Sequence, residues 1–280
     1  MFLSKPMGEA MKRVLLAGAA LFALAATPPA LAADPPYWAP PSMAAPFSWN
    51  GFYIGANGGY SWQDVRPVEL LTDNILPAPN NLGQATAASR GTIGDIRAQG
   101  GFVGGQVGYN WEFGPSVLFG IEADLQYARI EGSTTGVFTN PSGTIPISGA
   151  ANFNIDWFGT VRGRVGMMAD SWLLFGTAGL AYGRVGYNLS ATETGGLALF
   201  QTALSASETK YGYVVGAGVE YAFTANVILK GEYQFINLGA IGATAPVTNI
   251  IGGGLTGETA TLRAIDAAFH TFRLGLNFKL

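Results

Sequence analysis

The stretch DWFGTVRGRVGMM, residues 156–168, places two arginines in an otherwise apolar, glycine-rich run. Side chains two residues apart in a β-strand point to the same face of the sheet. Arg162 and Arg164 would therefore share one face. The opposite face would carry Trp157, Val161, Val165 and Met167. A strand with an apolar outside and a charged inside reverses the usual pattern of a water-soluble protein.

The same period-two alternation recurs along the rest of the chain. It is found in residues 50–62, 100–113, 117–129, 172–185, 211–223, 227–235 and 270–280, which makes eight expected strands with residues 156–168. In most of them one face is apolar and the other carries glycine, amide and charged residues. The two faces of 172–185 are hard to distinguish, and we assign Leu174, Ala178, Leu180 and Tyr182 to the outside.

The links between these strands alternate in length. GPS, ADS and TAN are short turns of about three residues, whereas the links over about 64–97, 131–151, 187–208 and 238–265 are long. After the N-terminal region, no window offers eighteen consecutive apolar residues. The pattern predicts an all-β fold, an eight-stranded antiparallel up-and-down transmembrane β-barrel, with long links outside the cell and short turns in the periplasm.

Aromatic residues support this fold. They gather near the ends of the expected strands and would form girdles at the two membrane interfaces: Tyr60, Trp62, Trp111, Tyr127, Trp157 and Trp172. A water-soluble eight-stranded calyx is the structural alternative, but it would place its apolar face inside. Only a closed barrel lets extended backbone satisfy its hydrogen bonds in lipid.

The N-terminal region predicts export. Lys12 and Arg13 precede an apolar run over 14–26, and small residues follow at 30–32. Residues 1–32 therefore resemble a secretory signal peptide, cleaved after Ala32. Residues 33–48 are rich in proline and predict an extended, solvated periplasmic tether. Residues 49–280 would form the barrel.

Composition narrows the function. The chain has 40 glycines in 280 residues, no cysteine, only 12% charged residues and a net charge of −3. This balance gives no basic surface for nucleic acid. An exported chain without cysteine must also be stable without disulfides.

Several segments together resemble a known family. WNGFYIGANGGY, GGFVGGQVGYNW, GIEADLQY, DWFGTVRGRVG, LLFGTAGLAYG, VGAGVEYAF and HTFRLGLNFKL look like the small outer-membrane β-barrel proteins of alphaproteobacteria, which have OmpA-like transmembrane barrels and are often labelled "porin family". The resemblance covers about residues 49–280. It implies a location in the cell outer membrane and a C-terminal assembly signal, here Phe278 and Leu280, although such proteins usually end in an aromatic residue.

The alternation assigns eight ionisable residues to the lumen. The acids are Glu122, Asp124, Glu220 and Glu232, and the bases are Arg162, Arg164, Lys230 and Arg273. An eight-stranded barrel is only wide enough to be filled by side chains. Counting from the short turns places Glu220 opposite Lys230, and the two arginines at a similar depth to Glu122 and Asp124. We therefore expect a network of ion pairs that plugs the lumen.

The sequence offers little chemistry for catalysis or metal binding. His270 is the only histidine, and no serine lies two residues after it, where barrel enzymes that trim lipid A would place one. No pair of histidines or cysteines exists for zinc. We expect no catalytic residue, no metal site and no cofactor.

The function expected is structural. We predict a monomeric envelope barrel with surface-exposed loops, whose partners are outer-membrane lipid and the outer-membrane assembly machinery. Two alternatives stay open, because the sequence alone does not exclude them. One is a narrow channel for small solutes, and the other is a surface binder, for haem or a cell-surface partner, that uses the long links.

Overall fold

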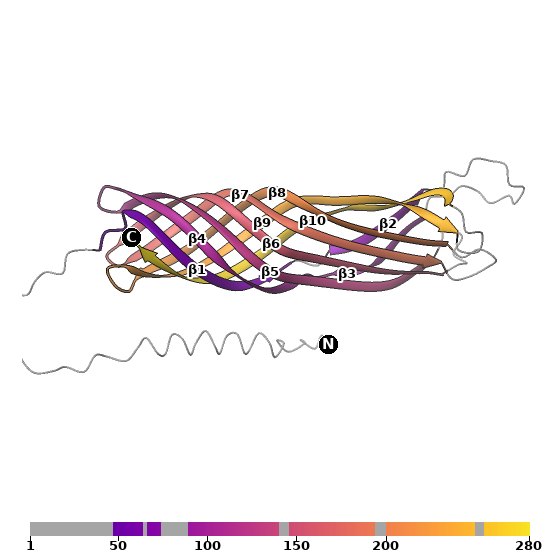
Figure 1. Cartoon of the computed structure of the whole chain (residues 1–280), viewed down its shortest axis with the longest axis horizontal. Helices are drawn as coiled ribbons and strands as arrows, with labels where there is room; N and C mark the ends of the chain where they lie inside the picture. Colours follow the sequence, from indigo (N-terminus) through magenta and orange to yellow (C-terminus); the bar gives the residue numbers. More distant parts are fainter. Residues whose placement is uncertain (1–46, 64–65, 74–88, 140–145, 194–199, 250–254) are drawn as a thin grey trace, which may run out of the picture. The chain divides into compact units, whose positions relative to one another are not determined.

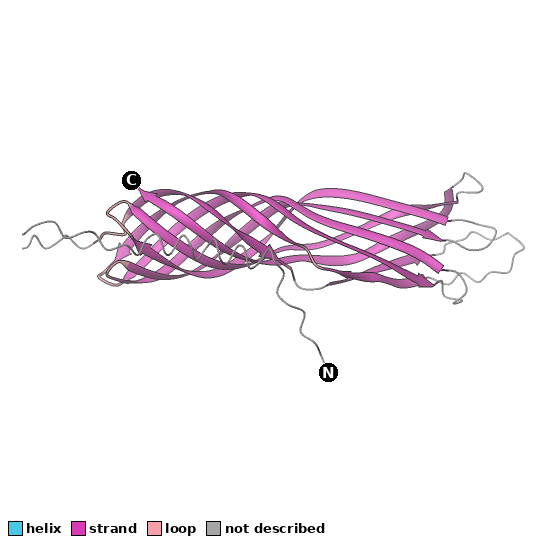
Figure 2. Cartoon of the chain, turned by 90° about the horizontal axis from the view of Figure 1, so that it is seen from below, coloured by secondary structure: helices cyan, strands magenta, loops and turns pink. Residues whose placement is uncertain are grey.

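The computed structural model describes residues 47–63, 66–73, 89–139, 146–193, 200–249 and 255–280. The expected signal peptide, its cleavage position and most of the expected tether lie outside these residues. Figure 2 draws the strands of the described part in magenta, and no helix in that part is long and apolar enough to cross a membrane. The ten strands found there are β1 Gly51–Trp62, β2 Arg66–Asp73, β3 Ser89–Ile96, β4 Gln99–Phe113, β5 Val117–Thr139, β6 Pro146–Ala169, β7 Trp172–Glu193, β8 Phe200–Ala222, β9 Val227–Asn249 and β10 Leu255–Lys279.

Eight of these strands close into one antiparallel ring (Figure 1). The ring runs β1-β4-β5-β6-β7-β8-β9-β10, and β10 pairs back with β1 from Tyr53–Lys279 to Trp62–His270. Neighbours in the ring are also neighbours along the chain, apart from the β2–β3 hairpin. The prediction of an eight-stranded antiparallel up-and-down barrel is confirmed.

The β2–β3 hairpin lengthens the ring without adding strands to its circumference. Trp62 of β1 pairs with His270, and Leu70 of β2 pairs with Leu262, eight residues further along both strands. The backbone of β2 therefore continues β1 along the edge of β10. In the same way β3 follows β5 beyond the end of β4, where the carbonyl of Ile93 lies against Gly136.

The prediction that 131–151, 187–208 and 238–265 are loops was wrong for most of their length, and the same prediction for 64–97 was wrong for the two strands found there. Strands β5 to β10 run well into these segments, and β2 and β3 occupy part of the first. The strands were missed because these segments carry small and polar residues on one face, a composition that water-exposed strands share with loops.

The short turns are close to the prediction. Gly114–Ser116 joins β4 to β5, Asp170 and Ser171 join β6 to β7, and four residues join β8 to β9. Gly114 has φ of 73° and Asp170 has φ of 51°, in the left-handed region that glycine and aspartate tolerate best in tight turns. These three turns lie at one end of the ring, beside the C-terminus (Figure 1).

The outer wall of the barrel divides into two regions. Near the short turns it is an apolar belt, and β5 shows its extent, because Phe119, Ile121, Leu125 and Tyr127 all point outward. The span from Phe119 to Tyr127 is nine residues long, which matches the 9–11 residues that a transmembrane strand needs. The outward faces of all eight expected strands agree with the prediction, the uncertain β7 included.

Beyond the belt the wall becomes polar, and we call this part the extension. In β5 it begins after Tyr127, where the next outward residues are Arg129 and Glu131. Tyr127 and Trp157 form a cross-strand pair in the middle of β5 and β6. The prediction that these aromatic residues mark strand ends was therefore wrong for this pair: they mark the edge of the belt, and the strands continue past it.

The last residues of the expected tether are packed onto the barrel. Phe47 contacts Trp49 edge to face, with ring centroids 4.8 Å apart, and Lys279 donates a hydrogen bond to the carbonyl of Ser48. Glu112 accepts hydrogen bonds from the backbone of Trp49 and Asn50. Phe47 and Ser48 therefore contact the barrel at its mouth, and residues 33–46 of the expected tether lie outside the described residues.

Candidate functional site: a charged layer sealed inside the barrel

The structure brings all eight predicted luminal charges into one layer inside the belt. Each is at most 4% exposed. Glu122 and Asp124 come from β5, Arg162 and Arg164 from β6, Glu220 from β8, Lys230 and Glu232 from β9, and Arg273 from β10. Four acids and four bases make the layer neutral overall, which buried charges require.

Glu122 lies at the centre of this layer. Its carboxylate forms ion pairs with all four bases: it contacts Arg162 directly, Lys230 at 2.7 Å, Arg273 at 3.2 Å and Arg164 at 3.4 Å. Neighbouring strands predicted only the contacts of Glu122 with the arginines of β6, and the structure adds Lys230 of β9 and Arg273 of β10. The network therefore joins side chains from several strands at the centre of the barrel and is not confined to one pair of neighbouring strands.

Arg162 and Arg164 have different partners. Arg162 bridges Asp124 at 2.9 Å and Glu232 at 2.5 Å, besides Glu122. Arg164 binds Glu220 through both terminal nitrogens, at 3.0 and 2.8 Å. Sequence reasoning placed both arginines against Glu122 and Asp124. It missed the contact of Arg164 with Glu220 of β8. Arg164 can reach this strand because its side chain is long and the lumen of an eight-stranded barrel is narrow.

Arg273, Glu232 and Lys230 complete the layer. Arg273 binds Glu232 at 2.6 Å and Asp124 at 2.9 Å. Lys230 pairs with Glu220 across β8 and β9 in the register predicted, but its ammonium is 3.9 Å from Glu220 and only 3.1 Å from Glu232. Each base therefore contacts more than one acid.

An apolar cluster closes the layer toward the short turns. It comprises Trp49, Leu118, Leu173, Phe175, Ala222 and Ile228, with Phe47 and Met168 packed beside it. The ring of Phe175 lies under the charges, 4.3 Å from the guanidinium carbon of Arg164 and 5.1 Å from the ammonium of Lys230. These cation–π contacts join the charged layer to its lower seal.

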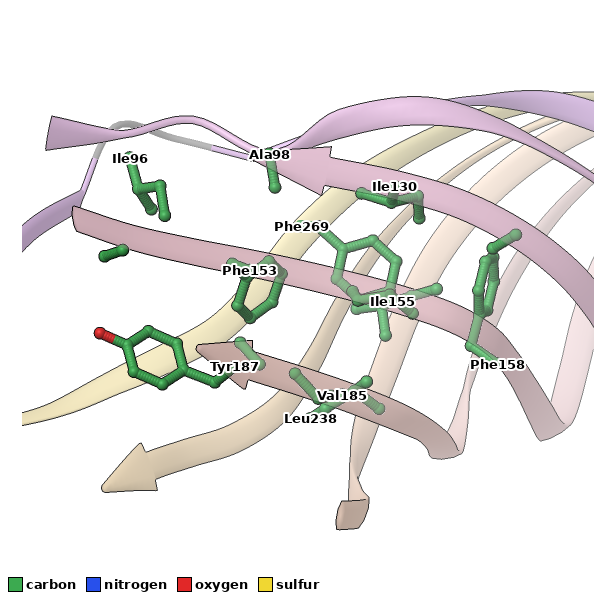
Figure 3. Close-up of a cluster of buried hydrophobic side chains, with 14 of the residues drawn as sticks. Ile96, Ala98, Ile130, Phe153, Ile155, Phe158, Val185, Tyr187, Leu238 and Phe269 are labelled. Carbon is green, nitrogen blue, oxygen red and sulfur yellow. The ribbon is translucent and has the colours of Figure 1, made fainter. Parts of the chain in front are cut away.

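A second and larger apolar cluster closes the layer on the other side. Phe158 packs edge to face against Phe102 at 5.3 Å and against Phe269 at 5.5 Å, so three aromatic rings from three strands cover the lumen. Above them, Figure 3 shows Ile130, Phe153, Ile155, Val185 and Leu238 pointing into the extension from the surrounding strands. Inside the extension the core is that of an ordinary water-soluble protein.

These apolar clusters are the residues that sequence reasoning missed. Strand β6 shows why the period-two pattern missed them. In its first part the odd-numbered residues Phe153 and Ile155 point inward. Further along the strand, the even-numbered residues Phe158 and Arg162 point inward. The change of face occurs at Asp156, which is unpaired in both ladders of β6. A β-bulge inserts one residue and so exchanges the two faces of a strand, and a strict period-two reading cannot follow it.

Two buried tyrosines in these regions differ in the hydrogen bonding of their hydroxyl groups. The Tyr53 hydroxyl donates to Glu122 at 2.6 Å and accepts from Arg164 at 2.8 Å. Tyr187 is equally buried in the extension, but its hydroxyl has no hydrogen-bond partner in the described residues. Burial raises the pKa of this Tyr187 phenol.

Replacing Tyr53 by phenylalanine should lower the free energy of unfolding by about 1–3 kcal/mol, because a charged network loses a bridging group. Tyr187→Phe should leave it unchanged or raise it by about 1 kcal/mol, since an unpaired hydroxyl is removed. Urea unfolding of the two variants in lipid vesicles measures the difference. Equal losses in the two variants would contradict the assignment of these partners.

His270 lies outside the lumen, at the edge of the belt. Its Nδ1 is 2.6 Å from the Tyr233 hydroxyl, and its ring stacks on Trp62 with centroids 5.7 Å apart. Within the described ranges, no group of three histidine, cysteine or acidic side chains is placed to hold a metal ion. The predicted assembly residues Phe278 and Leu280 are exposed at the belt end beside the short turns.

Comparison with known proteins agrees with this architecture. The model of the outer membrane protein beta-barrel domain family matches residues 17–279. The 31 kDa outer-membrane immunogenic protein of Brucella melitensis is 36% identical over 276 residues, which cover 96% of this chain and all of that protein. The 22 kDa outer membrane protein of Rhizobium leguminosarum is 34% identical over 190 residues, 67% of this chain and 64% of that protein.

Solved structures show only a distant likeness. The attachment invasion locus protein Ail of Yersinia pestis covers 82% of this chain and 99% of its own, with 13% identity and a TM-score of 0.31. OprG of Pseudomonas aeruginosa covers 82% of this chain and 98% of its own, with 9% identity and a TM-score of 0.39. The sequence relationship is the stronger finding: this chain belongs to the outer membrane protein beta-barrel family and is a protein of the Gram-negative cell outer membrane.

Proposed function

We propose that this protein is a structural, non-conducting barrel of the outer membrane, whose lumen is plugged by its own side chains. The observation that carries the proposal is the burial of all eight luminal charges between two apolar clusters. A conducting pore needs a continuous path of water, and its charged residues would line that path. Here the charged groups neutralise one another and are covered at both ends.

The extension supports a role at the cell surface. Strands β5 to β9 continue well past the belt, and their outer wall there is polar. We infer that this end faces the outside of the cell and the three short turns face the periplasm. The name of the Brucella relatives, outer-membrane immunogenic proteins, fits a surface that a host meets.

We also infer that the role requires no catalysis and no cofactor, and that the barrel acts as a monomer whose partners are lipid and the assembly machinery. Because the ring of eight strands is closed, the described part of the belt has no unpaired strand edge with which a second copy could pair. The single histidine of the chain lies among Trp62, Tyr233 and Phe235 and so serves the edge of the belt.

Single-channel recording tests this proposal. Purified barrel inserted into a planar lipid bilayer should produce no current steps above the bare bilayer, while a general porin inserted under the same conditions gives the positive control. Insertion is verified by the heat-modifiable gel mobility of the recovered protein. Reproducible current steps from the inserted protein would overturn the plugged lumen and favour a narrow channel for small solutes.

A further inference from the structure

Two neighbouring strands of the extension lie beside each other without a continuous ladder. Strand β8 pairs with β9 at Phe200 and Gln201 and again from Tyr213 to Ala222, and among the described residues no pair lies between these two stretches. Residues 202–212 of β8 are nevertheless extended and pair with β7 along their whole length. The backbone groups of 202–212 that point away from β7 therefore have no ladder partner, and we call this side of the strand the free edge of β8.

The inner face of β8 is accessible along this free edge. Directly paired residues share one face of a sheet. Val185 of β7 is the partner of Glu208, and it is 3% exposed because it points into the extension. Glu208 lies on the same inner face, yet its side chain is 59% exposed, and that of Lys210, two residues further along, is 25% exposed. A face that is buried on β7 is thus open to solvent one strand away.

Glu208 and Lys210 decide which strand can pair with the free edge. They form an ion pair at 2.8 Å, and within the described ranges neither side chain has a second ion-pair partner. Inward-pointing charges protect a sheet edge against indiscriminate pairing. A strand without matching charges would cover this pair and leave it poorly solvated, which costs free energy. The free edge therefore favours a strand that places opposite charges against these two residues.

The register of an antiparallel partner follows from these positions. An acid would lie opposite Lys210 and a base opposite Glu208. The next two inward positions lie opposite Ala206 and Leu204, and Leu204 packs against the apolar cluster of the extension. Since an antiparallel partner runs in the reverse direction, it reads acid–x–base–x–apolar–x–apolar from its N-terminus, where x is an outward residue.

We infer that the free edge of β8 binds an extended peptide segment of another protein by antiparallel strand addition, and that this segment carries the pattern acid–x–base–x–apolar–x–apolar. Main-chain hydrogen bonds supply affinity in this mode of recognition, and alternate side chains supply specificity. A second copy in the same membrane does not fit, because β8 runs in the same sense in both copies and two such strands cannot meet antiparallel. The inference rests on the wall of the extension, so a conducting lumen would leave it intact.

The chain itself supplies a probe with this pattern. Residues 208–214, ETKYGYV, carry an acid, a base, a glycine and a valine at the four inward positions. A synthetic peptide of this sequence with a fluorescent label is added to the folded protein in detergent micelles, and empty micelles give the blank. Fluorescence anisotropy should show saturable binding to the protein.

Exchange of the two charges tests the register. Glu208→Lys with Lys210→Glu in the protein should weaken binding of the peptide about tenfold, because like charges then lie opposite one another. The same exchange in the peptide should restore binding to the exchanged protein. Arg129→Glu with Glu131→Arg is the matched control, since it exchanges an exposed ion pair of the same spacing on β5, where the ladder with β4 is continuous. This control should bind the native peptide as the unchanged protein does, and heat-modifiable gel mobility verifies that every variant is folded.

Methylation of the peptide backbone separates strand addition from charge attraction alone. N-methyl groups on alternate residues block one of the two edges of the peptide, and one of the two alternate sets should abolish binding. The inference is overturned by absence of saturable binding, by undiminished binding after the charge exchange, by an equal loss in the control, or by full binding of both methylated peptides. Association of the protein with itself that the charge exchange abolishes would assign the free edge to a second copy and would also overturn it.

Discussion

Replacing both Arg162 and Arg164 by leucine is expected to lower the free energy of unfolding by about 3–5 kcal/mol or more. Removal of one partner from a buried ion pair leaves an uncompensated charge, and each such loss costs about 3–5 kcal/mol. Here two of four bases disappear while Glu122, Asp124, Glu220 and Glu232 stay buried. Any water that enters the lumen would reduce the loss. Urea unfolding in lipid vesicles, followed by tryptophan fluorescence, measures it.

The structure defines the rescue of this variant. Adding Asp124→Asn and Glu220→Gln removes one main partner of each missing arginine and leaves Glu122 and Glu232 with Lys230 and Arg273. This charge-balanced variant should recover a large part of the lost stability. Arg97→Leu, a change at an exposed arginine, should alter stability by less than about 0.5 kcal/mol. A double leucine variant as stable as the native barrel would contradict the inward placement of both arginines.

Phe158→Ala is expected to cost about 3–5 kcal/mol, the range for removing a buried aromatic side chain and leaving a cavity. Phe158 is 1% exposed and contacts two other aromatic rings above the charged layer. The effect should appear in the same unfolding measurement, together with faster proteolysis of the extension. Val137→Ala, on the outer wall of β5 and 67% exposed, is the control and should stay within about 0.5 kcal/mol.

The same variant separates two interpretations of the extension. If the extension has the packed core described above, Phe158→Ala destabilises and Val137→Ala does not. If the strands beyond the belt were instead loosely held loops, both variants would be equally stable. That result would contradict the packing of three aromatic rings over the lumen. Conductance of the Phe158 variant should remain at the level of the bare bilayer, because the charged layer still fills the lumen.

The sequence by itself determined the belt half of this barrel. Inside lipid, every outward residue must be apolar and the narrow lumen takes the polar ones, so period-two alternation identifies the strands, their faces and the eight luminal charges. The register of Glu220 with Lys230 followed from counting back along two strands from a short turn. These features depend only on residues that are close along the chain and on a single surrounding medium, the lipid, so the sequence was enough to predict them.

Only the tertiary structure decided the rest. The strands of the extension pass from lipid into water, where the preferred faces exchange, and the bulge at Asp156 exchanges them again within β6. The same alternation of apolar and polar residues assigns opposite faces in lipid and in water. The inward face of these strands therefore cannot be assigned before it is known which of the two surrounds them. The pairing of Arg164 with Glu220, the central position of Glu122 and the three rings over the lumen join strands that are not neighbours in the ring. Closure of the barrel brings them together, since side chains reach across a lumen only after the last strand has paired with the first.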